Sequence, residues 1–157
     1  KIGKKSGMHV SIIRPSLVYG PGVKGHLELM LSGIVKGWFP PLPETKNKKS
    51  MIHVDDLVRA CLMLADDDRT NGEIFIITDG TPYSSRDIYI IMCNIMGRII
   101  PKWCVPKVLF NIVSLINPNF KYKVNKLFAD DFYSSVKLEA LGFKAKKSLK
   151  DMNETDF

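Results

Sequence analysis

One segment constrains the fold of this chain more than any other: an apolar run that stops at a proline and opens into a glycine-rich turn. Residues 8–14 (MHVSIIR) are rich in β-branched side chains and precede Pro15, which predicts a short buried strand. Residues 16–25 carry three glycines and a proline and predict a loop. Ligands of open α/β sheets bind at the carboxyl ends of strands, so the break predicts a ligand site. A turn that only redirects the chain is the alternative.

The rest of the chain alternates between strand and helix patterns. Apolar spacing predicts an α/β fold in one domain, residues 1–157. A Ser84-to-Asp87 capping box opens one of the helices. The further predicted strands are 50–54 and 73–78, and the predicted helices are 27–36, 55–65, 85–96, 105–116 and 134–141.

The helix expected over 105–116 is strongly apolar, with Lys107, Asn111 and Ser114 as a narrow polar stripe. Burial in a core is the favoured interpretation, and docking on a membrane or a partner is the alternative. Apolar stretches are interrupted well before the ~20 residues that a membrane span needs. No signal peptide is recognised, and three cysteines without CxxC spacing predict reduced thiols and a cytoplasmic protein.

The formal net charge is +7, which is compatible with nucleic acid, anionic lipid or a phosphorylated ligand. The lysine clusters are not interleaved with aromatic residues, so nucleic acid is not an expected partner. One cluster, Lys46, Lys48 and Lys49, precedes a predicted strand and is suited to bring point charges to a phosphate.

Residues 50–57 run from a strand directly into a helix. His53 stands three residues before Asp56, but no third ligand is spaced to complete a metal site, so none is expected. We expect Asp55 to cap the helix, with both carboxylates favourably placed toward the helix dipole.

Two signatures of cofactor chemistry are absent from the sequence. There is no GxGxxG or GxxGxxG, so no pyrophosphate loop is predicted. The Tyr-x-x-x-Lys spacing occurs at Tyr122/Lys126 and Tyr133/Lys137, in a lysine-rich part of the chain, and both are interpreted as chance. No catalytic residue is therefore assigned.

Three segments together resemble the extended short-chain dehydrogenase family of NAD-dependent nucleotide-sugar epimerases and dehydratases. They are RPSLVYGPG (14–22), SMIHVDDLVRA (50–60) and KLEALGF (137–143), in the family's order and spacing. The resemblance implies the C-terminal, sugar-nucleotide-binding part of such an enzyme: the trailing elements of a Rossmann sheet with a small mixed α/β substrate-binding lobe. It also implies that the NAD-binding domain and the catalytic Tyr-x-x-x-Lys pair are absent from this chain.

The resemblance implies roles for individual residues. Pro15 and Ser16 stand where the family's backbone meets the nicotinamide end of NAD. Leu17, on the same cofactor-side segment, replaces an Asn that contacts the sugar nucleotide in many members. His26 and Leu27 replace an Asn-Leu pair that holds the nucleotide.

The later segments supply the rest of the implied pocket. Leu42 and Pro43 are expected against the base. Lys49 takes the position of a diphosphate-binding Arg, and Lys126 or Lys123 is the candidate for a second such Arg. Replacing Lys49 by Ala is expected to weaken binding while leaving thermal stability nearly unchanged.

The implied function is NAD-dependent epimerisation, reduction or dehydration of a UDP-sugar in surface-polysaccharide synthesis, with no catalysis by this chain alone. One alternative is a stand-alone nucleotide-sugar-binding module. Another is a steroid- or flavonol-type short-chain dehydrogenase, which shares RPxxVYGPG; the lysine cluster and HVDDL favour a phosphorylated sugar instead. The full-length enzyme could also form a homodimer.

Overall fold

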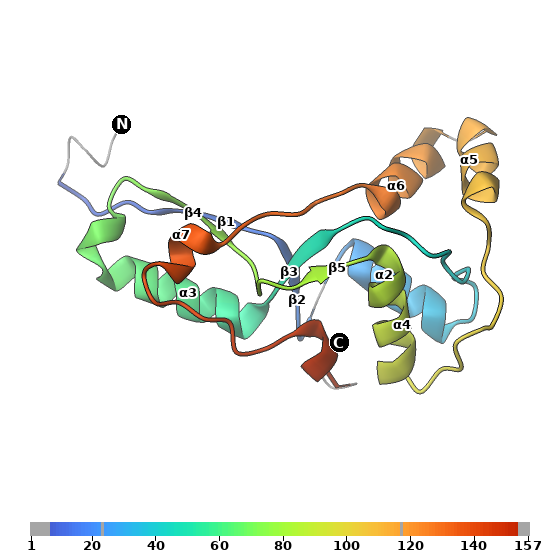
Figure 1. Ribbon diagram of the computed structural model, residues 1–157, viewed down its shortest axis with the longest axis horizontal. Helices are drawn as coiled ribbons and strands as arrows, with labels where there is room; N and C mark the ends of the chain where they lie inside the picture. The colour runs from blue at the N-terminus through green and yellow to red at the C-terminus, as the bar shows by residue number, and fades with distance from the viewer. Residues whose placement is uncertain (1–6, 23, 117, 154–157) are drawn as a thin grey trace.

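The computed structural model describes residues 7–22, 24–116 and 118–153 and has an α/β fold with parallel strand pairs (Figure 1). The helices pack around two small groups of strands, and two 3-10 turns complete the fold. The strands are β1 (Ile12–Pro15), β2 (Leu17–Tyr19), β3 (Lys49–His53), β4 (Ile74–Ile77) and β5 (Pro82–Tyr83). The helices are α2 (His26–Val35), α3 (Val54–Asp66), α4 (Ser85–Ile95), α5 (Lys107–Ile116), α6 (Pro118–Phe128) and α7 (Val136–Glu139), and the 3-10 turns are Asp68–Thr70 and Leu149–Asp151.

The chain changes strand partner at Ser16. Strand β1 pairs in parallel with β4, whereas β2 pairs in parallel with β3, which in turn pairs antiparallel with β5. Ser16 lies between β1 and β2, and its backbone N–H donates to the Ile77 carbonyl oxygen at 3.0 Å. The backbone therefore bends where the two sheets meet.

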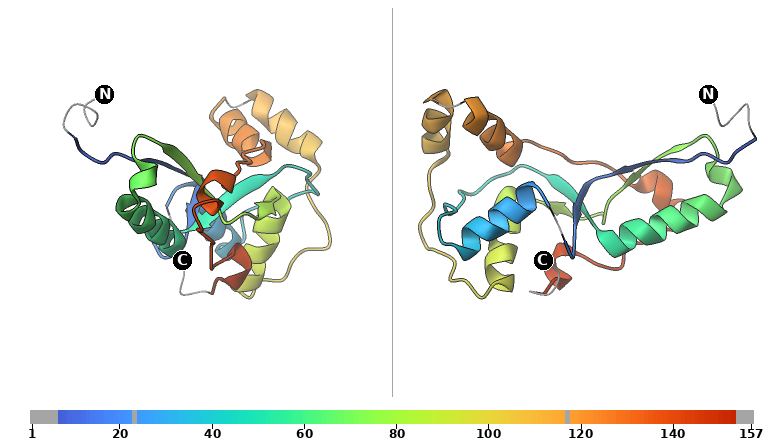
Figure 2. Two further views of the ribbon diagram at one scale, coloured as in Figure 1. Left: turned by 60° about the vertical axis from the view of Figure 1, so that its left-hand side comes forward. Right: turned by 180° about the vertical axis from the view of Figure 1, so that it is seen from behind.

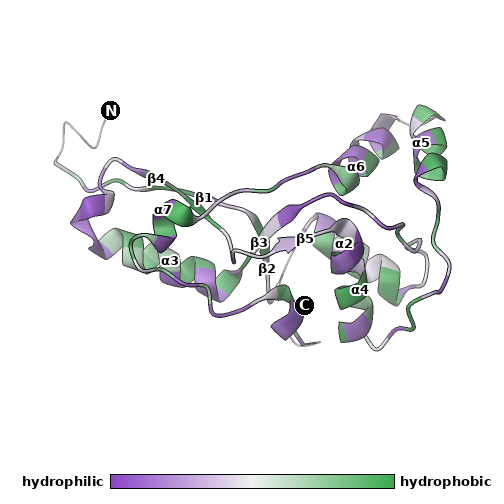
Figure 3. Cartoon of the chain, in the orientation of Figure 1, coloured by the Kyte–Doolittle hydropathy of each residue, from purple (hydrophilic) through white to green (hydrophobic). Residues whose placement is uncertain are grey.

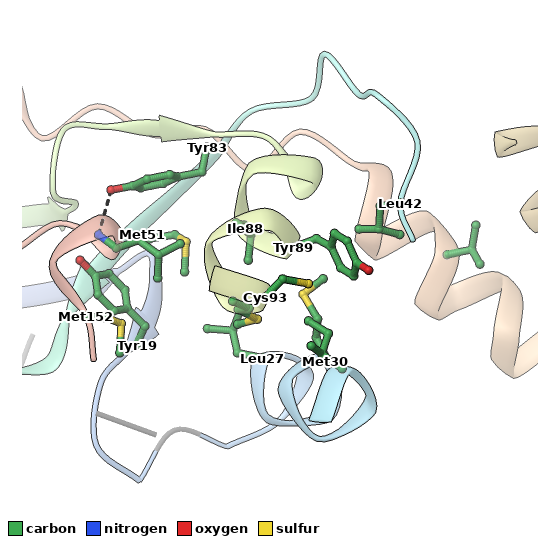
Figure 4. Packing of buried hydrophobic residues seen from close by; sticks show 14 of the residues in the cluster. Tyr19, Leu27, Met30, Leu42, Met51, Tyr83, Ile88, Tyr89, Cys93 and Met152 are labelled. Carbon is green, nitrogen blue, oxygen red and sulfur yellow. Dashed lines mark hydrogen bonds between the residues drawn. The ribbon is translucent and has the colours of Figure 1, made fainter. Parts of the chain in front are cut away.

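The molecule is elongated, with a different apolar cluster at each end (Figures 1 and 2). Strands β1 and β4 lie with α3 and α7 at one end, and α2, α4, α5 and α6 lie at the other. The first cluster includes Leu64, Phe75 and Leu138. In the second, Leu27 and Met30 of α2 face Ile88, Tyr89 and Cys93 of α4 (Figure 4).

A buried tyrosine connects the C-terminal turn to the second cluster. The Leu149 backbone N–H donates to the Tyr83 hydroxyl at 3.1 Å (Figure 4), and that hydroxyl donates to Asp79 at 2.9 Å. Burial raises the pKa of Tyr83 to about 12, so the phenol stays protonated as a donor.

Several sequence-based boundaries were wrong. The first strand begins at Ile12 rather than at residue 8, and the expected loop 16–25 contains β2. Tyr19 is buried and pairs with His53, so tertiary pairing overrides the glycine-rich composition. The polar segment 118–128 forms α6, and the last helix extends only from Val136 to Glu139.

The start of α3 also differs from expectation. His53, rather than Asp55, is the N-cap residue, and its Nδ1 accepts from the Asp55 N–H at 3.1 Å. Asp56 is buried and accepts from the backbone N–H groups of Lys146 and Lys147 at 2.9 and 2.8 Å. By contrast, the capping box between Ser84 and Asp87 is confirmed.

The expected burial of helix α5 was wrong. Its inner face is narrow: Phe110 packs edge-to-face on Phe128 of α6, and the Ser114 hydroxyl donates to the Phe110 carbonyl. The broad apolar face is exposed, on a helix that lies at one end of the molecule and is coloured largely hydrophobic (Figure 3). Its exposed side chains are Val108, Leu109, Ile112, Val113 and Leu115.

Candidate functional site

A cavity of about 590 Å³ lies beside the junction of β1 and β2. This volume is within the range of sites that bind small organic ligands. Most of its wall is apolar and comes from α2, the segment after α2, α4, α5 and α6. The apolar side chains from these helices and this segment are Leu27, Leu29, Met30, Trp38, Phe39, Pro40, Ile88, Phe110, Phe120, Val124 and Leu127.

The cavity collects most of the site residues predicted from the sequence, which come from three separate stretches of chain. The carboxyl end of β1 borders it, as the strand-to-turn break predicted. The predicted residues on the wall are Pro15, Ser16, Leu17, His26, Leu27, Lys49 and Lys126.

Leu42 and Pro43 lie elsewhere. Both are buried, and neither is on the cavity wall. Leu42 is 0% exposed and packs in the second apolar cluster, while its carbonyl oxygen accepts from the Arg86 guanidinium. An apolar side chain gains more from this core than from a half-open wall. Their contact with a base stays a prediction.

Four basic side chains, which we call the basic arc, border the cavity: His26, Lys49, Lys123 and Lys126. The pKa of His26 is held below its ordinary value, first by loss of hydration and then by the charges of Lys126, Lys123 and Lys49. Because three lysines act on one imidazole, the arc is a region of positive potential. Such a region favours an anionic ligand group.

Lys49 has a different environment from the one its sequence predicted. It is 7% exposed, and its ammonium donates to the carbonyl oxygens of Lys126 at 2.9 Å and Ala129 at 3.1 Å. It also donates to Asp131 Oδ2 at 3.2 Å. These bonds use all three ammonium protons. Lys49 therefore holds the end of α6, and with it Lys126, against β3.

Ser16 presents a buried polar atom at the cavity. Its hydroxyl oxygen is inaccessible to solvent and has no hydrogen-bond partner among the described residues. Ser16 also lines the cavity. A buried hydroxyl without a partner is costly, so it is a natural donor or acceptor for a bound molecule.

Neither Tyr-x-x-x-Lys spacing assembles a pair at the cavity. Lys126 lines the wall, but Tyr122 does not. Tyr133 lines the wall, whereas the Lys137 ammonium binds Glu73 and the Ile74 carbonyl oxygen, the latter at 3.1 Å.

Sequence reasoning missed part of the wall. Lys123 was only an alternative to Lys126, and the aromatic side chains of Phe110, Phe120 and Tyr133 were not assigned to the site. Lys123 and Lys126 are three residues apart, so recognising α6 as a helix would have placed both on one face.

The parallel strand pairs and their packed helices define an α/β protein with a basic cavity at the carboxyl end of β1 and beside the amino ends of β2 and β3. Residues 1–78, about half of the chain, match the sequence profile of the NAD dependent epimerase/dehydratase family. The chain belongs to this family.

Two curated relatives are similar to this chain over more than half of its length. A UDP-glucose 4-epimerase of Vibrio cholerae is 32% identical over 108 residues, which cover 67% of this chain and 32% of that protein. The short-chain dehydrogenase/reductase family 42E member 1 of Bos taurus is 25% identical over 123 residues, which cover 74% and 31%. The chain thus spans about a third of the length of each.

Solved structures share the fold. The UDP-glucose 4-epimerase of Thermotoga maritima, solved with UDP-glucose, has a TM-score of 0.66 at 19% identity, covering 95% of this chain and 45% of that one. The enzyme WbmF of Bordetella bronchiseptica, solved with NAD⁺ and UDP, has a TM-score of 0.68 at 22% identity, covering 95% and 44%.

Proposed function

We propose that the chain is the sugar-nucleotide-binding part of an NAD-dependent epimerase, dehydratase or 4-keto reductase that acts on a UDP-sugar. One observation carries the proposal: a mostly apolar cavity bears a basic arc along its border. The apolar wall suits a base and the faces of a sugar ring, and the arc suits a diphosphate. The relatives named for UDP-glucose and UDP support the same ligand class.

The residues of the basic arc have two roles: some can contact a diphosphate, and one holds α6 in place. Lys123 and Lys126 are exposed, and their ammonium groups have no partner among the described residues. They, with His26, are the groups available to a diphosphate. Lys49 is the support, because its ammonium donates to the Lys126 and Ala129 carbonyls at the end of α6 and to Asp131. Lys49 was expected to bind the phosphate directly. We propose instead that its ammonium positions Lys126 by donating to the Lys126 carbonyl oxygen.

The cofactor assignment concerns Pro15, Ser16 and Leu17. The Ser16 hydroxyl fits a contact with a polar group of NAD, because it is buried, lines the cavity and has no other partner in the described part of the chain. Bound NAD would accept and return hydride. This chain's own residues would border its nicotinamide end and hold the sugar nucleotide. The acid/base pair is assigned to no residue of this chain.

A second candidate function is reduction or oxidation of an apolar substrate. The aromatic and aliphatic wall of the cavity favours it, as does the similarity to the family 42E proteins. The basic arc distinguishes the two functions, because an apolar substrate has no negative charge to pair with Lys123, Lys126 and His26.

Isothermal titration of the 157-residue chain tests the proposal, with UDP-glucose, UDP and uridine as ligands. We expect UDP-glucose and UDP to bind and uridine to bind much more weakly. Lys123→Gln and Lys126→Gln should each weaken UDP-glucose binding by about tenfold, the lower end for charge-assisted bonds because both side chains are exposed.

Lys121→Gln is the matched control, since Lys121 is exposed on the same helix but absent from the cavity wall. It should leave the affinity unchanged. Equal binding of uridine and UDP, or equal losses in all three variants, would contradict a diphosphate site. Turnover of UDP-glucose by this chain with NAD would contradict the assignment of catalysis to residues outside it.

A further inference from the structure

Helix α5 exposes its apolar face to solvent, whereas an ordinary surface helix buries that face. At 3.6 residues per turn, residues 108, 109, 112, 113 and 115 share one continuous face. The side chains at these five positions are aliphatic and exposed, including Leu115 at 83%. The side chains turned toward α6, Phe110 and Ser114, are the buried ones. The helix therefore offers solvent the face that other helices bury.

The chain around this face is uniformly basic. No Asp or Glu occurs in the sequence between Asp87 and Asp130. The Lys107 ammonium stands over the Phe128 ring at 5.3 Å, at the border between α5 and α6. Lys102 and Trp103 are exposed on the segment that leads into α5. The basic residues of this stretch are Arg98, Lys102, Lys107, Lys121, Lys123 and Lys126.

We propose that the outward face of α5 docks on the surface of an anionic lipid bilayer. A short helix with one apolar face and flanking lysines lies in the plane of the interface, where the apolar face is buried and the lysines meet acidic headgroups. Trp103, which is exposed on the segment before α5, is a residue type that is enriched at the membrane–water interface. Among the described helices, none has the length and apolarity to cross a membrane, so the contact is with one surface.

Charge favours the bilayer over a second copy of the chain. A symmetric dimer through α5 brings the same patch of both copies together. Each patch carries lysines and no carboxylate within the stretch, so the two would repel. An acidic bilayer instead neutralises them. The docking face is distinct from the cavity, since Phe110 is buried and lines the cavity, whereas Leu109 and Ile112 are exposed and absent from its wall.

Vesicle co-sedimentation of the 157-residue chain tests the proposal. We expect binding to vesicles of phosphatidylcholine mixed with acidic phosphatidylglycerol, because a negative surface potential attracts basic segments. Binding to pure phosphatidylcholine, or in high salt, should be much weaker. Leu109→Ser with Ile112→Ser should weaken binding at least about tenfold. Lys102→Gln with Lys107→Gln should do so by roughly tenfold as well.

Matched controls separate docking from general stickiness. Val58→Ser with Leu62→Ser removes equally exposed aliphatic side chains from α3 and should change nothing. Lys46→Gln with Lys144→Gln removes two exposed lysines elsewhere and should have a smaller effect than the Lys102/Lys107 pair. Equal losses in the controls would overturn the proposal.

A second measurement needs no variant on the docking face. In a Trp38→Phe background, Trp103 is the remaining tryptophan. Its emission should shift to the blue with acidic vesicles and be quenched by brominated lipid. An unchanged spectrum with no sedimentation would overturn the proposal. The proposal would also be overturned if the chain does not bind vesicles and light scattering shows a dimer that the α5 serine variants dissociate.

Discussion

The Lys49 ammonium lies 3.2 Å from the Asp131 carboxylate, and Ser50, the next residue, donates its N–H to the Asp131 carbonyl oxygen at 2.9 Å. One aspartate thus binds the first two residues of β3 through its side chain and its backbone. The same ammonium binds the Lys126 carbonyl oxygen, so this contact fixes the helix that carries two members of the basic arc.

Replacing Lys49 by Ala should destabilise the protein, contrary to the sequence-based expectation. The change leaves the Lys126 carbonyl without its donor and the Ala129 carbonyl with only the Asn47 amide, and the Lys49 side chain that is lost is only 9% exposed. We expect a loss of about 2–3 kcal/mol, with water access at the cavity limiting the cost, and a melting temperature lower by about 5–10 °C. Lys48→Ala is the control, because its exposed ammonium only approaches the Phe132 ring. Equal melting temperatures would refute the supporting role.

Asp56 should be far more important for stability than its neighbour Asp55. Asp56 is 1% exposed and accepts from two backbone N–H groups and from Arg59. Asp56→Ala leaves those donors unpaired and should cost about 3 kcal/mol in urea unfolding. Asp55 is solvent-exposed and pairs with Lys147, so Asp55→Ala should hardly change the unfolding midpoint. Similar midpoints for the two variants would contradict this assignment.

Gly20 should tolerate substitution less well than Gly22 in the same turn. Both have positive φ, +131° and +73°, so an L side chain is strained at either position. A Cβ on Gly20 would also lie 2.7 Å from Val54 Cγ1 and 3.2 Å from His53 Nε2, whereas Gly22 has nothing within 4 Å. We expect Gly22→Ala to cost about 1–2 kcal/mol and Gly20→Ala about 1–3 kcal/mol more. Denaturant midpoints measure the difference, and equal losses would contradict the steric argument.

UDP-glucose should raise the pKa of His26. In the free protein, lost hydration and three lysines depress it. A bound diphosphate adds negative charge beside the imidazole and reverses part of this effect. Binding therefore takes up protons, so affinity should rise as the pH falls from about 8 toward about 6. NMR titration of the His26 ring with and without ligand measures the shift, and His26→Gln should remove that part of the pH dependence. An unchanged pKa would place the diphosphate elsewhere.

The same imidazole should make the fold slightly sensitive to acid. The folded-state pKa of His26 lies below the ordinary value of 6.5, so the unfolded chain binds the proton first as the pH falls. The stability associated with neutral His26 is complete above the unfolded pKa and decreases through the interval down to the folded pKa. Thermal melts across that interval should fall less steeply for His26→Gln than for the wild type. Parallel curves would contradict the linkage.

The sequence by itself determined the elements whose signals are local. Helix α4 begins at Ser84 because its capping box closes between residues three apart. Strand β3 and helix α3 follow from an apolar run that passes directly into a helical pattern. The family resemblance and the break at Pro15 singled out Ser16 and His26 as site residues, and both line the same cavity.

Only the tertiary structure decided the features that depend on distant partners. Strand β2 is three residues long and exists because β3 pairs with it. Lys49 supports α6 because the carbonyl oxygens of Lys126 and Ala129, far along the chain, lie within hydrogen-bond distance of its ammonium. Helix α5 shows its apolar face to solvent because α6 packs on the narrow face of Phe110 and Ser114. Periodicity gives the faces of a helix, but the neighbour that packs against it decides which face is buried, and that neighbour is specified by long-range packing.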